Sequence, residues 1–174
     1  MNLQPTHLQN HLIKLLPLKE ADFERLYQVA ADPRIWEQHP QKNRYKREVF
    51  QTFFEGAMQS GGAFLVLDVA TGEPIGSSRY YDFNEAEKTI AIGYTFLAKA
   101  YWGGLYNGAQ KELMLRHIFQ YVDAVVLHIG PQNIRSQRAA LKIGARKKEG
   151  TYYNPDGEER LEFVIDKNDF DKKA

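Results

Sequence analysis

The sequence contains no cysteine and no long hydrophobic run. The lack of cysteine excludes disulfides, thiolate zinc sites and cysteine nucleophiles, and it is compatible with a reducing compartment. No hydrophobic run approaches the roughly 20 residues that span a bilayer. The segment Met1–Asn10 is polar and lacks the hydrophobic region of a signal peptide. We therefore expect a cytoplasmic protein that does not bind a membrane.

The sequence also lacks a strong excess of charge of either sign. Its 23 Lys and Arg residues nearly balance its 22 Asp and Glu residues, which gives a formal net charge of +1. No overall electrostatic attraction to nucleic acid or to a membrane surface is therefore expected. The basic clusters at 42–47 and 146–148 are typical of solvated surface, and nucleic-acid binding by residues 42–47 stays a minor alternative.

Several common catalytic and binding motifs are missing as well. The sequence has no Gly-x-Gly-x-x-Gly and no Gly-x-Ser-x-Gly, and Gly72–Ser78 lacks the length and the lysine of a phosphate-binding P-loop. The five histidines show no paired spacing of the kind that binds a metal ion, so no metal is expected.

The patterning that is present indicates one domain of 1–174 with a core at about 11–166. The 174 residues, 43% of them hydrophobic, are enough for one folded unit. Hydrophobic periodicity and turn residues predict strands alternating with helices. The predicted strands are 11–16, 63–69, 74–83, 89–97, 125–129, 145–153 and 158–165, and the predicted helices are 23–30, 50–57, the segment from the loop at 100–109 to about 122, and 133–142.

Two of these strands carry a prediction about burial. In the strand 89–97, period-two alternation predicts Ile90, Ile92, Tyr94 and Phe96 on one face. The continuous hydrophobic run 125–129 predicts a strand buried on both faces. Further on, Asn154-Pro-Asp-Gly157 is a strong turn signal and predicts a hairpin.

The loop Ala100-Tyr-Trp-Gly-Gly-Leu-Tyr-Asn-Gly-Ala109 lies between a predicted strand and an amphipathic helix. The first N–H groups of a helix have no partners within the helix, and they attract anions together with the helix dipole. Gly103 and Gly104 would let the backbone approach a ligand closely. The loop therefore indicates a phosphate site, with an ordinary surface turn as the alternative.

A second segment, Asn133-Ile-Arg-Ser136 through Leu141-Lys-Ile-Gly-Ala145, supports the phosphate interpretation. Together with the loop Tyr101–Asn107, it resembles the GNAT superfamily of acetyl-CoA-dependent N-acetyltransferases. Ile92-Gly-Tyr94 is similar to the branch that includes the ribosomal-protein N-acetyltransferases. The resemblance covers about 11–166 and implies an α/β (α+β) fold, with a mixed, mostly antiparallel sheet of about seven strands flanked by four helices.

The resemblance implies where acetyl-CoA, the co-substrate, would bind. The pantetheine arm would follow the main chain of 95–97, in a gap between the strands 89–97 and 125–129. The pyrophosphate would lie on N–H groups of 102–107. The family's usual loop reads Gln/Arg-x-x-Gly-x-Gly/Ala, and its three specified positions are occupied here by Trp102, Leu105 and Asn107. Lys99 and Arg135 are additional candidates for the nucleotide phosphates. The implied cofactor residues are Thr95, Phe96, Leu97, Trp102, Gly103, Gly104, Leu105, Tyr106, Asn107, Asn133 (also a helix N-cap) and Arg138.

The catalytic groups are less well defined by the resemblance. Ser136 is the candidate proton donor to the CoA thiolate, with a local helix-start role as the alternative. Many relatives have a glutamate as general base at the position that Ala91 occupies here. An amine with a pKa of about 10.4 is neutral about once in 2,500 molecules at pH 7, and an α-amine with a pKa of about 7.8 about once in seven. The missing glutamate thus slightly favours an α-amine or a water-relayed base.

Polar residues near the end of the strand 74–83 are the remaining candidates. Tyr81, Asp82 and Glu85 could each serve as the base, and Arg79 could bind a carboxylate or phosphate of the acceptor. The sequence thus predicts direct transfer of an acetyl group to a primary amine of a protein N-terminus or a small molecule. A non-catalytic acyl-CoA-binding module is the alternative.

Overall fold

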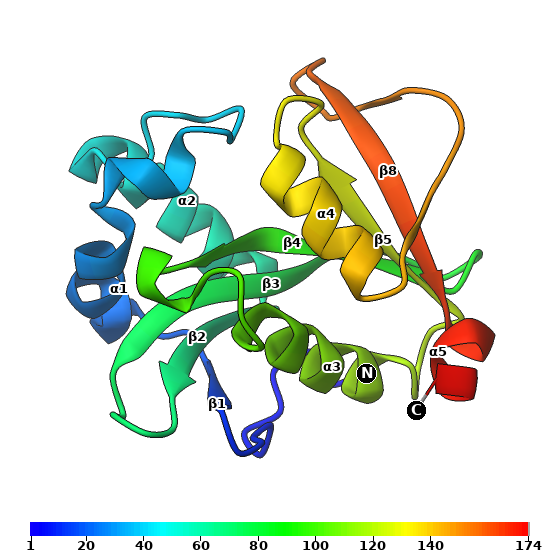
Figure 1. Ribbon diagram of the computed structural model, residues 1–174, viewed down its shortest axis with the longest axis horizontal. Helices are drawn as coiled ribbons and strands as arrows, with labels where there is room; N and C mark the ends of the chain where they lie inside the picture. The colour runs from blue at the N-terminus through cyan, green and yellow to red at the C-terminus, as the bar shows by residue number, and fades with distance from the viewer. Residues whose placement is uncertain (174) are drawn as a thin grey trace.

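Eight strands within residues 1–173, the part of the chain that the computed structural model describes, form a sheet between two layers of helices (Figure 1). The strands are β1 (Ile13–Pro17), β2 (Ala63–Asp68), β3 (Pro74–Asn84), β4 (Thr89–Leu97), β5 (Ala124–Ile129), β6 (Arg146–Lys147), β7 (Tyr152–Tyr153) and β8 (Glu159–Asp166). The helices are α1 (Phe23–Ala30), α2 (Arg47–Ser60), α3 (Tyr106–Ile118), α4 (Ile134–Lys142) and α5 (Lys167–Lys173), with short 3-10 turns η1 (Glu20–Asp22), η2 (Pro33–Trp36) and η3 (Lys99–Tyr101).

The strand order in space is β1-β2-β3-β4-β5-β8-β6, and β7 also pairs with β8. Of these pairs β4–β5 is parallel, and the others are antiparallel. The predicted mixed, mostly antiparallel sheet is thereby confirmed. No helix between residues 1 and 173 is long and apolar enough to cross a membrane.

Two hydrophobic clusters lie on opposite faces of the sheet, as the alternation along β2 shows. Phe64 and Val66 belong to the cluster that includes Met114 of α3, whereas Ala63 and Leu65 belong to the cluster of α1 and α2. Period-two alternation places successive side chains on opposite faces. The amphipathic stripes predicted from the sequence therefore cover both faces of the sheet at its β1–β4 end.

The predicted alternation along β4 is wrong beyond Ile92. Ile90 and Ile92 pack in the α3 cluster, but Phe96 packs in the α1–α2 cluster and Tyr94 is 41% exposed. The cause is a bulge, because Tyr94 has a φ of 51° and the β3–β4 register shifts between Ser77 and Arg79. An extra residue in one strand reverses the faces of the residues that follow it.

The strands β4 and β5 pair over a short length and then separate (Figure 1). Their register covers Thr89–Ala124, Ile90–Val125 and Ala91–Val126, and it stops there. In β5, Val125, Leu127 and Ile129 are buried, whereas Val126 and His128 are half-buried. The prediction that this strand is buried on both faces is therefore wrong, because α1 and α2 pack against the other end of the sheet.

The C-terminal region differs most from the prediction. The strand predicted at 145–153 is two short strands, β6 and β7, and Gly150 between them has a φ of 95° that breaks extended structure. The turn at 154–157 does join β7 to β8, with Gly157 N–H donating to the Asn154 carbonyl. Helix α5 was not predicted, because its sequence KNDFDKK carries a single apolar residue.

Candidate functional site

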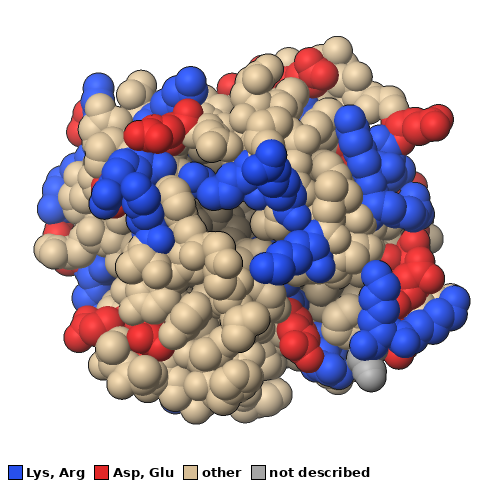
Figure 2. All heavy atoms as spheres, in the orientation of Figure 1, with Lys and Arg blue, Asp and Glu red and all other residues tan. Residues whose placement is uncertain are grey.

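A cavity of about 210 Å³ opens where β4 and β5 separate. The space-filling view shows a hollow in the corresponding face, with lysine and arginine side chains at its rim (Figure 2). Residues from β4, β5, α4 and the loop before α3 line the cavity. The predicted residues among them are Thr95, Phe96, Leu97, Trp102, Gly103, Gly104, Asn107, Asn133 and Ser136, whereas Leu105, Tyr106, Arg138, Arg79, Tyr81 and Asp82 are not among the lining residues.

The loop before α3 is fixed by side chains on both sides of its glycines. The hydroxyl groups of Tyr101 and Tyr106 donate to the buried carboxylate of Asp68 at 3.2 and 3.3 Å. The indole of Trp102 donates to the Leu97 carbonyl at 2.8 Å. Gly103, with a φ of 70°, provides the left-handed turn between these anchors.

The start of α3 meets the physical requirements of an anion site. Its N-cap residue, Leu105, has ordinary right-handed angles and offers no side-chain cap to the first N–H groups of the helix. The substitution of the family's usual glycine by Leu105 therefore causes no backbone strain. Gly104 faces open space, since no atom lies within 4 Å of the position that its Cβ would take. Backbone N–H groups of this turn are thus accessible to a bound anion.

Helix α4 brings a second set of polar groups to the cavity. The side chain of Asn133 accepts a hydrogen bond from Ser136 N–H at 3.2 Å, which confirms its predicted role as N-cap. Arg135 lies with its Cζ 3.8 Å from the centroid of the Trp102 ring and donates to the Ile35 carbonyl. This stacking places a cation directly beside the loop that precedes α3.

A buried lysine forms part of the cavity wall. Lys111 of α3 donates through Nζ to the hydroxyl of Thr95 at 2.6 Å, and that hydroxyl is 2.7 Å from Ser78 Oγ. Burial lowers the pKa of Lys111 to about 7. The side chain had no sequence signal, because a lysine at a buried helix position resembles one on a solvated face.

A chain of three polar side chains lies on the open face of β3, β5 and β8. The hydroxyl of Tyr81 is 3.0 Å from Nδ1 of His128, and Nε2 of His128 is 3.1 Å from a carboxylate oxygen of Glu162. His128 lines the cavity and stacks on Tyr152 with ring centroids 4.0 Å apart. Burial raises the pKa of Tyr81 well above its ordinary value, so the phenol is protonated at rest. The order tyrosine, histidine, carboxylate is suited to relaying a proton.

The position of Ala91 shows how the chain of Tyr81, His128 and Glu162 relates to the missing glutamate. Ala91 pairs with Tyr81 across the β3–β4 ladder and with Val126 of β5. Tyr81 and His128 therefore lie next to the position where many members of the family that the sequence resembles carry a glutamate. Tyr81 was predicted from the sequence, whereas His128 was noted only among histidines without metal-site spacing. The contact of His128 with Glu162 depends on a strand register that was not predicted.

The other predicted residues lie farther from the cavity. Asp82 and Glu85 are exposed at the β3–β4 turn, where Asp82 has a φ of 50°. Lys99 lies in η3 and is exposed, and Arg138 lies in α4; neither lines the cavity. Within residues 1–173 no cluster of three or more His, Asp or Glu side chains could hold a metal ion.

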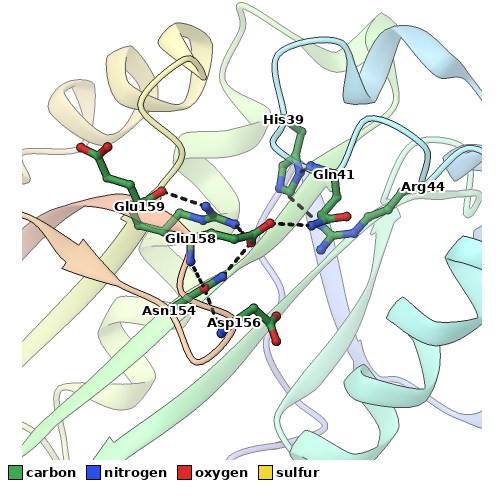
Figure 3. Close-up of polar contacts among 8 residues, drawn as sticks. His39, Gln41, Arg44, Asn154, Asp156, Glu158 and Glu159 are labelled. Atoms are coloured by element: carbon green, nitrogen blue, oxygen red, sulfur yellow. Dashed lines mark hydrogen bonds and ion pairs between the residues drawn. The ribbon is translucent and has the colours of Figure 1, made fainter.

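A polar network joins the segment before α2 to the β7–β8 turn (Figure 3). Glu158 accepts hydrogen bonds from Gln41 at 3.2 Å, from Asn154 at 2.9 Å and from Arg160 at 2.6 Å. On the facing loop, Arg44 Nη1 is 3.3 Å from the ring of His39. Burial and the positive charge of Arg44 lower the pKa of His39 to about 3, so this ring is neutral at pH 7. His39 and Arg160 of this network also line the cavity.

Comparisons with known proteins agree with this geometry. A family model described as "Acetyltransferase (GNAT) domain" matches residues 13–146. No curated protein matches the sequence. A GCN5-related N-acetyltransferase from Brucella melitensis is similar at 18% identity, over 97% of this chain and 83% of that one, with a TM-score of 0.80.

Two further solved structures have the same fold. An acetyltransferase of the GNAT family from Bacillus anthracis is 18% identical over 92% of this chain and 98% of that one, with a TM-score of 0.75. RimJ from Mycobacterium smegmatis, solved in complex with CoA-disulfide, is 18% identical over 90% of this chain and 82% of that one, with a TM-score of 0.70. At these identities the likeness establishes the shared fold.

Proposed function

The chain belongs to the GNAT acetyltransferase family and is an N-acetyltransferase of that type, and on this premise we propose how it carries out the transfer. We propose that acetyl-CoA binds in the cavity between β4 and β5. We further propose that a primary amine, on a small molecule or at a protein N-terminus, attacks the thioester directly. No observation favours the alternative from the sequence, a non-catalytic acyl-CoA-binding module.

One observation carries the acetyl-CoA proposal: the separated strands, the loop before α3 and the start of α4 all border one cavity. An extended pantetheine arm can add to the free edge of a separated strand much as a peptide strand does. The anionic pyrophosphate fits the uncapped N–H groups at the start of α3. Arg135 provides positive charge at the same place. RimJ, which was solved with CoA-disulfide, has the same fold.

The proposed proton path begins at Tyr81. As the amine nitrogen forms its bond to the acetyl carbon, its proton passes to the Tyr81 oxygen while the phenol proton passes to His128 Nδ1. The carboxylate of Glu162 stabilises the resulting imidazolium through Nε2. The C–S bond then breaks, and the thiolate takes a proton from the hydroxyl of Ser136, the proposed donor. The Ser136 oxygen regains a proton from solvent as the His128 imidazolium releases its own to solvent. Positioned proton transfer of this kind contributes about 10²–10⁴-fold to a rate.

The test of the proposed function is thiol release from acetyl-CoA, measured with purified protein and a panel of amines. We expect amine-dependent release, and we expect calorimetry to detect acetyl-CoA binding without an amine. Failure of acetyl-CoA to bind at millimolar concentration would contradict the proposal. The variant Ser136→Ala is measured with the same amines. A turnover equal to that of the native protein would remove Ser136 from the proton path.

Gly104→Val tests the phosphate site. The β-branched side chain would cover the N–H groups of the turn, so we expect the affinity for acetyl-CoA to fall about tenfold or more, as for the loss of a charge-assisted hydrogen bond. Because the added Cβ meets no atom within 4 Å, the fold should be unaffected. Gly104→Ala serves as the graded control with a smaller loss, and unchanged affinity in both variants would show that the phosphate binds elsewhere.

Gly93→Ala tests the position of Tyr81. A Cβ on Gly93 would lie 3.1 Å from the Tyr81 hydroxyl and 3.0 Å from its Cε1, so the ring must shift. We expect kcat to fall about tenfold because the proton path depends on sub-ångström positioning. Steady-state kinetics at saturating acetyl-CoA is the measurement. A normal kcat would indicate that Tyr81 does not need its present position.

A further inference from the structure

Two arginines beside Tyr94 have almost no polar partners. Arg79 is 6% exposed, and within residues 1–173 its side chain makes no hydrogen bond or ion pair, with Nε fully buried. Arg44 has one polar contact in the same range, with the ring of His39. Each guanidinium offers several N–H donors and no acceptor. Buried donors are almost always paired in folded proteins, so Arg79 lacks an acceptor that a ligand could provide, and the half-buried Arg44 beside it has further donors for the same ligand.

Both guanidiniums lie against the same aromatic rings. Arg79 Cζ is 3.5 Å from the ring centroid of Tyr94, and Arg44 Cζ is 5.7 Å from it. The two Cζ atoms are 5.2 and 4.8 Å from the centroid of Phe53. Tyr94 lines the cavity, and its ring centroid is 5.1 Å from that of Tyr81. The two cations are therefore separated by one ring from the proposed proton path.

Two acidic groups nearby, Glu158 and Glu162, already have partners. Glu158 accepts from Arg160, Asn154 and Gln41 (Figure 3). Glu162 is paired with Lys148 at 2.6 Å and with His128. Burial lowers the pKa values of Arg44 and Arg79 to about 10, so both are charged at neutral pH. Buried charge without a counter-ion is costly, and an anionic ligand would offset that cost.

We infer that the amine acceptor carries an oxyanion, a carboxylate or a phosphate, which Arg44 and Arg79 bind while the amine reaches Tyr81. The inference rests on the proposed function and names its substrate class. A guanidinium can bind either oxyanion through two parallel hydrogen bonds. Because Glu158 already pairs with Arg160, Asn154 and Gln41, Arg44 and Arg79 keep their donors for a ligand.

The same charges would assist the chemistry. Positive charge near an amine disfavours its ammonium form and so lowers its pKa. An acceptor that brings its own anion gains an ion pair, and only the guanidinium charge that this anion does not neutralise lowers the pKa of its amine. A polyamine, which adds further positive charge, would be repelled. The site therefore recognises the acceptor and also favours the neutral amine, an effect that a glutamate base would otherwise provide.

The test compares matched amines that differ in the anion. The pairs are O-phosphoethanolamine with ethanolamine, glycine with glycinamide, and a peptide that begins with aspartate with the same peptide that begins with asparagine. We expect kcat/KM to be at least tenfold higher for the anionic member of one pair or more. The pair that responds distinguishes a phosphate from a carboxylate and a small molecule from a chain terminus. Equal efficiency within every pair would overturn the inference.

Variants separate binding of the anion from catalysis. Arg79→Met and Arg44→Met are expected to abolish the preference without changing the KM for acetyl-CoA, and Arg79→Lys to retain part of it. Arg25→Met is the control, because Arg25 is exposed and pairs with Asp22 away from the cavity. Arg44→Met keeps the test valid if Arg79→Met does not fold, since Arg44 is only half-buried. A preference that persists in both folded methionine variants would overturn the inference.

A binding measurement makes the inference independent of turnover. Calorimetry of O-phosphoethanolamine and glycine is performed on protein saturated with CoA, with ethanolamine and glycinamide as references. If no amine reacts, the proposed function fails, and this measurement still decides the inference. Binding of an anionic member that is lost in Arg44→Met supports it, and binding of neither anionic member contradicts it.

Discussion

Replacing His128 with alanine is expected to lower the kcat for acetyl transfer by about 10²-fold or more, the usual contribution of a positioned acid–base group. His128 is the group that takes the proton from Tyr81, and its Nδ1 lies 3.0 Å from the phenol oxygen. Without the imidazole, Tyr81 has no proton acceptor, because burial raises its pKa and opposes formation of the phenolate. The measurement is steady-state thiol release at saturating acetyl-CoA and amine.

Three controls make the His128 result specific. Acetyl-CoA affinity, measured by calorimetry, should be unchanged, since the loop before α3 binds the phosphates in our proposal. Glu162→Gln should cause a smaller loss, because it removes the charge that stabilises the imidazolium but keeps a hydrogen-bond acceptor. His11→Ala, at an exposed position, should have normal kcat. A normal kcat for folded His128→Ala would contradict the proton path.

The parts of the site that the sequence predicted depend on local chemistry. An N-cap such as Asn133 acts on the N–H of Ser136, three residues away, and so can be recognised in one segment. The glycine pair before α3 is equally local, and Gly103 does adopt the left-handed angles that glycine permits. The resemblance of these two segments to one family then predicted a mixed, mostly antiparallel sheet and a gap between the strands that are now β4 and β5. Family and fold are confirmed, whereas the acetyl-CoA contacts stay predictions.

The parts that were missed depend on register between distant strands. His128 meets Glu162 because β5 pairs with β8, and no local pattern encodes which residue of β8 faces His128. The bulge at Tyr94 reversed the faces of β4, and Tyr94 is a residue type for which a positive φ is uncommon. This bulge also places Tyr94 beside Arg79. Burial of Lys111 likewise follows from the docking of α3, so polarity alone suggested a surface position.

Replacing Lys111 with methionine is expected to stabilise the fold, most strongly at or below pH 7. Burial lowers the pKa of Lys111 from 10.5 to about 7. Between these two pH values the unfolded chain holds a proton that the folded chain has lost, so the stability of the native protein rises with pH across this interval. Each unit of difference corresponds to about 1.4 kcal/mol, which sets an upper limit of ~5 kcal/mol for the cost of Lys111 at pH 7. Methionine has a similar unbranched chain and carries no such cost.

The difference in unfolding free energy between Lys111→Met and the native protein isolates this effect, because all other titrating groups cancel. Urea unfolding at pH 7, 8 and 9 should show an advantage of the variant that shrinks with pH, by about 1 kcal/mol from pH 7 to 8 and by nearly 1.4 kcal/mol from pH 8 to 9. The hydroxyls of Thr95 and Ser78 keep each other as partners at 2.7 Å, so the variant leaves no new unpaired group there. Lys42→Met, at an exposed position, should change stability little. An advantage of Lys111→Met that is independent of pH would contradict this explanation. The expected slope would show that the native protein retains a costly buried amine against Thr95, in the wall of the cavity proposed to bind acetyl-CoA.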